Sequence, residues 1–339
     1  MKDIYDILRE WKKRRGEKCQ SGSALALATL VCIKGSSYRR PGARMLICTD
    51  GNSVGSLSAG CLEEEVASRA RQVLLSGEPA LVSFDTRKRF GCAGKIDIFI
   101  ECVAETFFVN LAENLDARRG CVAITRFAGD KRGSRIQGFD YGPLPSVAAA
   151  TCGVAGEQEH ELVQHIHPPV RLLIFGGGRD STPLDLFASS LGWETFEVID
   201  ANQLPTEPDE WTAAIVKSHN YGRDFAVLQK LLPLDLRYVG LIGPRKRRNQ
   251  LLSDLLDVGL TINAGFFAPA GLDLGAETPE EIALAIVSEI QRVFTATSGE
   301  SLRDRKISIH ANTTPSLRPK SKNYVAAAKG DTAASRRIN

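Results

Sequence analysis

Two cysteines lie in glycine-containing turns, where a thiol can reach a bound ligand. Cys61 follows Gly60 and precedes a helical pattern that starts at about Leu62, and Cys92 lies in the sequence FGCAG. Thiolate is a soft metal ligand, and the positive end of a helix dipole favours it, whereas the three glutamates at 63–65 oppose it by repulsion. We predict that Cys61 and Cys92 are catalytic and that Cys61 is a metal ligand. Burial as small residues in tight turns is the alternative for each.

The sequence KGSSYRRPGAR, residues 34–44, forms a second group, which we call the arginine loop. Pro41 fixes one turn of this loop, and Gly35 and Gly42 leave others free. Guanidinium groups bind oxyanions in a bidentate manner, and a tyrosine ring adds a stacking surface. A solvated loop is the alternative interpretation. The predicted cofactor-binding residues of the loop are Lys34, Tyr38, Arg39, Arg40 and Arg44.

A third group follows the apolar run RLLIF and has the features of a nucleotide site. Gly176 and Gly178 suit a tight turn beside a phosphate, and Ser181 replaces the third glycine of the dinucleotide pattern. Asp200 ends the next apolar run, near the spacing of about 20 residues at which an acid binds a ribose hydroxyl. A tight turn in a nucleotide-free sheet is the alternative. The predicted cofactor-binding residues here are Gly176, Gly178, Arg179, Ser181, Asp200, His219 and Arg245.

His219 and Arg245 belong to this group because each follows a predicted strand at the same edge. His219 follows AAIVK, and Arg245 lies in GPRKRRN after RYVGLI. In an open parallel sheet, ligands bind beyond the carboxyl ends of the strands. His219 could instead cap the crevice with a hydrogen bond, and most of the basic run could be a solvated helix face.

The elements that must position these residues fall into two α/β parts. Period-two alternation and turn signals predict strands at 25–33, 44–49, 53–57, 81–86 and 96–102, with helices at the N-terminus and after Leu62. Residues 1–145 therefore read as a mixed α+β domain. Residues 146–169 are rich in proline and glycine, which indicates a linker.

Residues 170–300 alternate apolar strand patterns with helical ones, which predicts a Rossmann-like, doubly wound parallel sheet. The last helix has a capping box, with Thr278 as N-cap, Pro279 in the first turn and Glu281 three residues after the cap. Residues 311–339 carry six basic residues against one acid and read as a disordered tail.

Composition restricts the class of protein. A chain of 339 residues suits two domains, and no apolar run approaches the roughly 18 residues that cross a membrane. We expect no export signal, a cytoplasmic location and free thiols, because the eight cysteines are spread out rather than dense. The net charge of +3 comes from the tail, so the body offers no general case for binding nucleic acid. No CxxC or HxxxH spacing supports a closed structural zinc site.

Five motifs in order give the chain a family resemblance. They are KGSSYRRPGARM, GSLSAGCLEEEV, FGCAGKIDIFIE, YVGLIGPRKRR and GLDLGAETPEEIALAIVSEI. Over about residues 10–295 the chain resembles the XdhC/CoxI family. It departs from the family pattern at Ala59 and Ala93, where glycine is more frequent, and after Asp200, where an arginine two residues on is usual.

The resemblance implies an accessory protein, more a chaperone than an enzyme. Such proteins bind the molybdenum cofactor, as molybdopterin or its dinucleotide form, and support its sulfuration with a cysteine desulfurase. They insert it into an apo molybdoenzyme of the xanthine dehydrogenase or aldehyde oxidase type. By this resemblance, the arginine loop and the two cysteine turns hold the pterin and molybdenum. The second domain would hold a nucleotide extension or NAD(P). A thiol at Cys61 could take up persulfide sulfur. Delivery implies a docking surface, and a homodimer is compatible with it.

Two other classes of function remain open from the residues. One is an NAD(P)-dependent oxidoreductase that uses Cys61 or His219, although a dehydrogenase needs a positioned proton donor and few polar groups stand at the strand ends. The other is a redox-sensing interaction protein, which requires Cys61 and Cys92 to come within bonding distance.

Overall fold

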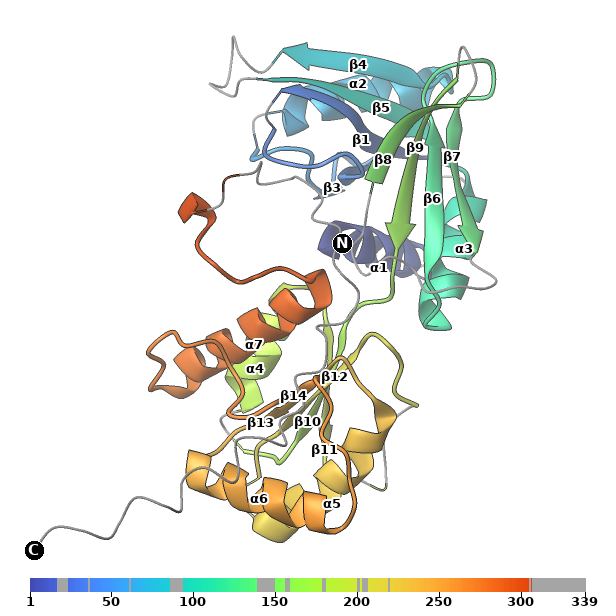
Figure 1. Cartoon of the computed structure of the whole chain (residues 1–339). Coiled ribbons are helices and arrows are strands. Elements are labelled where there is room, and N and C mark those ends of the chain that lie inside the picture. Colours follow the sequence, from blue (N-terminus) through green and yellow to red (C-terminus); the bar gives the residue numbers. More distant parts are fainter. Residues whose placement is uncertain are drawn as a thin grey trace, which may run out of the picture. The chain divides into compact units, whose positions relative to one another are not determined.

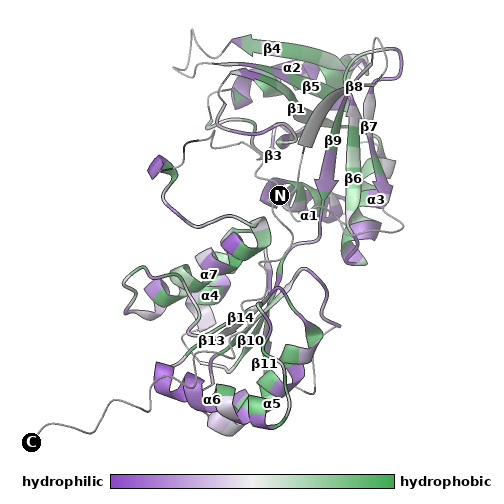
Figure 2. Cartoon of the chain, in the orientation of Figure 1, coloured by the Kyte–Doolittle hydropathy of each residue, from purple (hydrophilic) through white to green (hydrophobic). Residues whose placement is uncertain are grey.

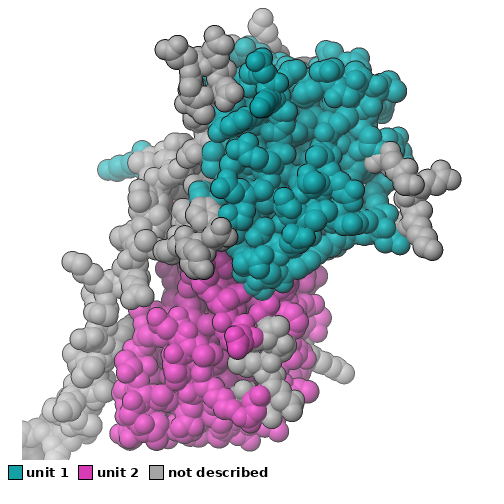
Figure 3. All heavy atoms as spheres, turned by 90° about the vertical axis from the view of Figure 1, so that its right-hand side faces the viewer, with its two compact units in different colours: residues 1–169, 305–312 teal, residues 170–304, 313–339 magenta. Residues whose placement is uncertain are grey.

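The computed structural model describes residues 1–16, 24–35, 37–60, 62–85, 94–138, 150–155, 159–178, 181–199, 202, 207–218, 220–304 and 306. The predicted tail at 311–339 lies outside them. The chain divides into two compact units with a boundary between Pro169 and Val170, coloured separately in Figure 3. We call the part up to residue 169 unit 1 and the part from residue 170 to 304 unit 2.

Unit 1 contains an antiparallel sheet, sheet 1, in the order β3-β2-β1-β5-β4 (Figure 1). Its strands, and the helix between β3 and β4, agree with the elements that the sequence predicts. They are β1 (Leu25–Gly35), β2 (Arg44–Cys48), β3 (Ser53–Gly55), α2 (Glu63–Ser76), β4 (Ala80–Asp85) and β5 (Gly94–Cys102).

A second antiparallel sheet of unit 1, sheet 2, has the order β7-β6-β9-β8. Its strands are β6 (Cys121–Arg126), β7 (Gly133–Gly138), β8 (Ala150–Ala155) and β9 (Glu159–Ile166). The prediction of a linker over 146–169 is therefore wrong where β8 and β9 lie. The glycines and prolines there are typical of loops, but Gly153 fits within β8 opposite Glu161.

The two faces of sheet 1 bury different sets of residues. Ala26 and Ala28 pack with Val66 and Ala70 of α2. On the opposite face, apolar residues of β1 and β2 pack with α1 (Lys2–Gly16), α3 (Glu105–Asp116) and sheet 2. Sheet 1 is thus a central layer, and only its strand ends are left for a site.

Unit 2 is built on a parallel sheet in the order β11-β10-β12-β13-β14, which confirms the predicted α/β fold. Its strands are β10 (Arg171–Phe175), β11 (Glu194–Val198), β12 (Thr212–Val216), β13 (Tyr238–Leu241) and β14 (Phe266–Phe267). The chain passes from β10 to β11 on one side and then to β12 on the other. The gap between β10 and β12 is therefore the topological switch point, where such sheets bind ligands.

Helices cover both faces of this sheet. Helices α4 (Ser181–Ser190) and α7 (Pro279–Thr295) share one apolar cluster, and α5 (Tyr221–Leu231) and α6 (Arg245–Asp257) share the other. Each carries both hydrophobic and hydrophilic residues (Figure 2), as expected for a helix with one face on a sheet. Two short 3₁₀ helices, Leu232–Leu234 and Leu302–Asp304, complete the described elements.

The capping box at the start of α7 is confirmed. The Thr278 hydroxyl accepts from the Glu281 amide at 3.3 Å, and the Glu281 carboxylate accepts from the Thr278 amide at 2.9 Å. Among the described residues, no helix is both long and apolar enough to cross a bilayer.

Candidate functional site

The topology of sheet 1 attaches three predicted site segments to one end of the sheet. β1 ends at Gly35, which pairs with Gly94 at the start of β5. β3 ends at Gly55, opposite Met45 near the start of β2, and β2 starts at the same end. The arginine loop, the turn before Cys61 and the β4–β5 connection that contains Cys92 therefore all join this end. Cys61 and Cys92 themselves lie outside the described residues.

Arg39 links the arginine loop to the segment that precedes Cys61. Its Nη1 donates to Ser56 Oγ at 3.2 Å, and its guanidinium forms an ion pair with Asp3 of α1. Two of the predicted segments are thus in direct contact, and the charge of Arg39 is partly compensated.

Exposed cations also belong to the segments at this end of sheet 1. Lys34 and Arg40 are exposed, and Tyr38 is 68% exposed. Lys34 lies directly opposite Lys95 of β5, which is also exposed, so two lysines are register partners on neighbouring strands; on its other side Lys95 lies opposite Asp85 of β4. Lys95 was absent from the sequence prediction because only strand register reveals its neighbour. These groups fit an anionic ligand with a flat ring.

Arg44 differs from the prediction, because it does not project from the loop. It is the first residue of β2, faces the interior between sheets 1 and 2, and is 1% exposed. Its Nη1 donates to Gly42 O at 3.2 Å and to Gln164 Oε1 on β9. Burial lowers the pKa of the Arg44 guanidinium to about 10, and Glu101 partly opposes this effect. Arg44 therefore fixes the end of the arginine loop through hydrogen bonds made in the protein interior.

Glu63 organises the turn before α2, a role that the sequence analysis missed. Its carboxylate accepts hydrogen bonds from Leu57 N at 3.2 Å, Ser58 N at 2.9 Å, Ser58 Oγ at 2.8 Å and Leu62 N at 3.0 Å. Partial burial alone would raise the pKa of Glu63, but these hydrogen bonds, led by those from Ser58, hold it below its usual value. This carboxylate is thus directed at the turn, where backbone donors compensate its charge.

The strand cysteines behave as core residues. Cys48 and Cys121 are buried, and Cys32 and Cys102 are half-buried; all four are free thiols. Burial raises the pKa of Cys48, and it raises that of Cys121 to about 12. Cys48 and Cys121 therefore stay protonated near neutral pH and are poor nucleophiles. In the described part of the chain, no cluster of three or more His, Cys, Asp or Glu side chains could hold a metal ion.

The glycine turn of unit 2 is tight and requires glycine at its first position. Gly176 has φ +106°, and a Cβ there would lie 2.8 Å from Ser218 N, so only glycine fits. Gly178 has φ +137°, and its carbonyl accepts from Ser181 N at 3.0 Å as α4 begins. Ser181 is 3% exposed, and its hydroxyl has no partner among the described residues. Arg179, Asp200 and His219 lie outside the described residues.

Arg247, rather than the predicted Arg245, is engaged at this edge of the sheet. Arg245 is exposed at the start of α6. Arg247 forms an ion pair with Asp224, and its Nη2 also donates to Ser218 O at 2.8 Å. Ser218 Oγ donates to Asp224 Oδ1 at 2.5 Å. We call these three residues the Ser218–Asp224–Arg247 network. The sequence run RKRR does not indicate which arginine turns inward.

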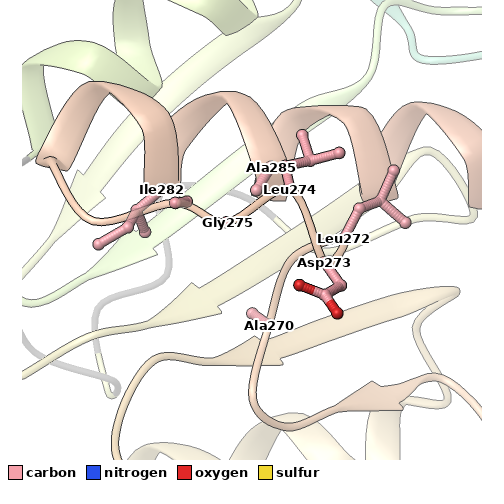
Figure 4. A pocket seen from close by; sticks show the side chains of 8 residues that line it. Ala270, Leu272, Asp273, Leu274, Gly275, Ile282 and Ala285 are labelled. Atoms are coloured by element: carbon pink, nitrogen blue, oxygen red, sulfur yellow. The ribbon is translucent and has the colours of Figure 1, made fainter.

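A pocket of about 250 Å³ lies where the chain returns from β14 to α7 (Figure 4). It is lined by Ala270, Leu272, Asp273, Leu274, Gly275, Ala276, Ile282 and Ala285. Glu289 anchors its loop by accepting from Gly271 N and from the Tyr238 hydroxyl, each at 2.8 Å. The pocket follows the carboxyl end of β14, and so lies at the same edge of the sheet as the glycine turn.

Comparison with known proteins gives consistent results for the two units. Residues 19–85 match the model of the XdhC and CoxI family, and residues 172–290 match that of the XdhC Rossmann domain. The chain is 28% identical over 307 residues to a probable xanthine dehydrogenase subunit of Bacillus subtilis, covering 78% of this chain and 91% of that one. It is 25% identical over 284 residues to the molybdenum cofactor insertion chaperone PaoD of Escherichia coli, covering 82% and 86%. A crystal structure of a xanthine dehydrogenase from Bacillus halodurans matches with a TM-score of 0.68 and 25% identity, over 89% of this chain and 98% of that chain.

Proposed function

Because the chain belongs to the XdhC and CoxI family, we propose that it is an accessory protein that handles the molybdenum cofactor for a molybdoenzyme of the xanthine dehydrogenase type. It binds the cofactor, supports its sulfuration and inserts it into the apo enzyme in the cytoplasm. The relative named as an insertion chaperone supports the delivery role.

The observation that carries this proposal is the gathering of three segments at one end of sheet 1. The hydrogen bond from Arg39 to Ser56 joins two of these segments, and Lys34, Lys95 and Arg40 add positive charge there. The pterin carries a phosphate and a flat ring, which cations and Tyr38 complement. Many charge-assisted contacts give reversible binding, and a carrier must release its cargo.

The two cysteines of these segments supply the sulfur chemistry in this proposal. The terminal sulfur of a desulfurase persulfide passes to the Cys61 thiolate, and the desulfurase thiolate leaves. Cys61 then holds the sulfur as a persulfide beside the molybdenum, to which thiolate is a suitable soft ligand. Cys92 belongs to the connection between β4 and β5, two strands whose described ends, Asp85 and Lys95, pair at this end of sheet 1.

Unit 2 binds the nucleotide part of the ligand, either that of a dinucleotide form of the cofactor or that of NAD(P). The glycine turn and the Ser181 hydroxyl at the start of α4, which has no hydrogen-bond partner within the described residues, support this assignment. Amide groups at a helix start and a small buried residue suit a phosphate.

The test is binding of molybdopterin to protein purified anaerobically, followed by pterin fluorescence and metal analysis. Arg39→Ala and Arg40→Ala should each weaken binding by about tenfold, the loss expected for a charge-assisted hydrogen bond. Arg135→Ala, which removes an exposed charge from β7, should leave affinity within about twofold. Unchanged affinity in both loop variants would remove the arginine loop from the site.

A reconstitution assay distinguishes a chaperone, which delivers the cofactor and leaves, from a permanent subunit of the finished enzyme. After activation of an apo molybdoenzyme, size-exclusion chromatography should show this chain released from the active enzyme, and Cys61→Ser should reduce activation while the protein stays folded. A stoichiometric complex that persists would favour permanent membership instead. Steady oxidation of NADH with a small substrate, lost on Gly178→Val, would favour an oxidoreductase.

A further inference from the structure

We propose that Arg247 is a positioning residue for the nucleotide site of unit 2. Through Asp224 and Ser218 it holds the segment after β12 against the glycine turn after β10. The inference rests on the nucleotide-binding part of the proposed function, and it concerns residues outside the predicted contacts.

The members of the network form hydrogen bonds and an ion pair with one another, and most of the network is buried. Asp224 is fully buried, so its carboxylate requires a partner of opposite charge, and Arg247 supplies it. The same guanidinium nitrogen donates to Ser218 O, and the Ser218 hydroxyl donates to Asp224. Removal of any one member leaves a buried polar group without its partner, which is costly.

Ser218 connects the network to the glycine turn through a close backbone contact. A Cβ on Gly176 would lie 2.8 Å from Ser218 N and 2.9 Å from Ser218 Cα, so the two segments touch backbone to backbone. Next to this contact, Lys217 N donates to Phe175 O at 2.9 Å. The position of Ser218 therefore sets the position of the turn that faces the phosphate.

The same network also orders the start of α5. Asn220 N donates to Ser218 Oγ at 3.2 Å, and the Asn220 side chain caps α5 by accepting from Arg223 N at 3.0 Å. Ser218 and Asn220 flank His219 in the sequence. Since α6, which carries Arg247, follows β13, the network ties together the carboxyl ends of β10, β12 and β13. This is the edge at which the switch point lies.

Arg247 acts through this framework rather than on the ligand. Its Nη2 donates to two protein atoms, namely Asp224 Oδ2 and Ser218 O. Without Arg247, the segment after β12 would no longer hold the glycine turn in place. Loss of Arg247 should therefore weaken the binding of every ligand that carries a pyrophosphate, whichever base the ligand bears.

The experiment uses the full chain and two probes, ADP and CDP, with dissociation constants measured by calorimetry. Arg247→Met and Asp224→Asn should each weaken both probes by about tenfold. The double variant should be no weaker than either single one, because both changes break the same link. Arg247→Lys, which keeps a cation opposite Asp224, should recover part of the affinity. Lys246→Met, an exposed neighbour on α6, is the control and should stay within about twofold.

Unfolding by urea is measured on every variant so that stability and affinity are separated. A lower unfolding midpoint with unchanged affinity in Arg247→Met would overturn the inference, because the pair would then only stabilise the fold. If Arg247→Met does not fold, Asp224→Asn at full wild-type affinity would overturn it as well. Absence of any ADP or CDP binding by the wild-type chain would refute the nucleotide part of the proposed function and, with it, this inference.

Discussion

The buried guanidinium of Arg44 on β2 donates to the side-chain oxygen of Gln164 on β9, and this hydrogen bond links the two sheets of unit 1. Gly42, with φ +93°, lies so close that a Cβ there would be 2.7 Å from the Gln164 side chain. The end of the arginine loop is thus held from the interior, while its outer residues face solvent.

Substitution Gln164→Leu should lower the free energy of unfolding by about 1–3 kcal/mol, because it leaves a buried donor of Arg44 without its side-chain acceptor. Urea denaturation monitored by circular dichroism measures the change. Gln137→Leu, at an exposed position on β7, is the matched control and should change stability by less than about 0.5 kcal/mol. Equal effects of the two substitutions would show that the inter-sheet hydrogen bond contributes nothing.

Glu63 should make the stability of unit 1 depend on pH in the acidic range. Its pKa in the folded state is below its usual value, so its contribution is fully present above the unfolded pKa of about 4.3 and is lost as pH falls through the folded value. Glu63→Gln should therefore be less stable than wild type at pH 7, and the difference should shrink below about pH 4.

The measurement for Glu63 is the urea midpoint at a series of pH values. Glu64→Gln removes a neighbouring but exposed charge and should show no such dependence. A difference between wild type and Glu63→Gln that stays constant from pH 7 to pH 3 would contradict the assignment of those hydrogen bonds to the ionised carboxylate.

Local patterns of the sequence were sufficient for sheet 1 and for the parallel sheet of unit 2, but they predicted neither α3 nor the strands of sheet 2. The capping box at Thr278 and Glu281 depends on residues three apart, and the strands of sheet 1 and the parallel sheet depend on alternation or on continuous apolar runs. Strands β8 and β9 escaped prediction because Gly153 and the prolines around the segment are typical of loops. Their stability comes from pairing: β8 pairs with β9, and β9 pairs with β6, which is distant in sequence.

The site was predicted less completely, since residue type indicates charge but not direction. Arg39 and Arg44 look alike in KGSSYRRPGAR, yet one contacts Ser56 at the loop and the other is buried against Gln164. Likewise the charge run RKRR conceals Arg247, whose partner Asp224 is on another helix. Contacts of this kind follow from strand order and helix phase, which sequence alone leaves open.

Gly176→Ala should damage unit 2 more than the neighbouring change Gly177→Ala. A Cβ at 176 would be 2.8 Å from a backbone nitrogen in a region of positive φ, whereas a Cβ at 177 meets nothing within 4 Å. We expect a loss of more than about 2 kcal/mol for Gly176→Ala and less than about 1 kcal/mol for Gly177→Ala. Urea unfolding followed by tryptophan fluorescence measures both, and comparable stability of the two variants would contradict the close approach to Ser218.

Lys34 offers a test in which stability and binding should change in opposite directions. On β1 it lies opposite Lys95, and like charges directly opposite each other destabilise a sheet. Lys34→Ala should therefore leave the unfolding free energy unchanged or raise it by about 0.2–1 kcal/mol. The same change should weaken molybdopterin binding by about fivefold, and more at low salt than at high salt, because exposed charges are screened. Lys131→Ala, at an exposed position between β6 and β7, should alter neither quantity. If Lys34→Ala raised stability and left affinity unchanged, the cationic pair would have no part in holding the ligand, and binding at the arginine loop would have to rest on Arg39 and Arg40.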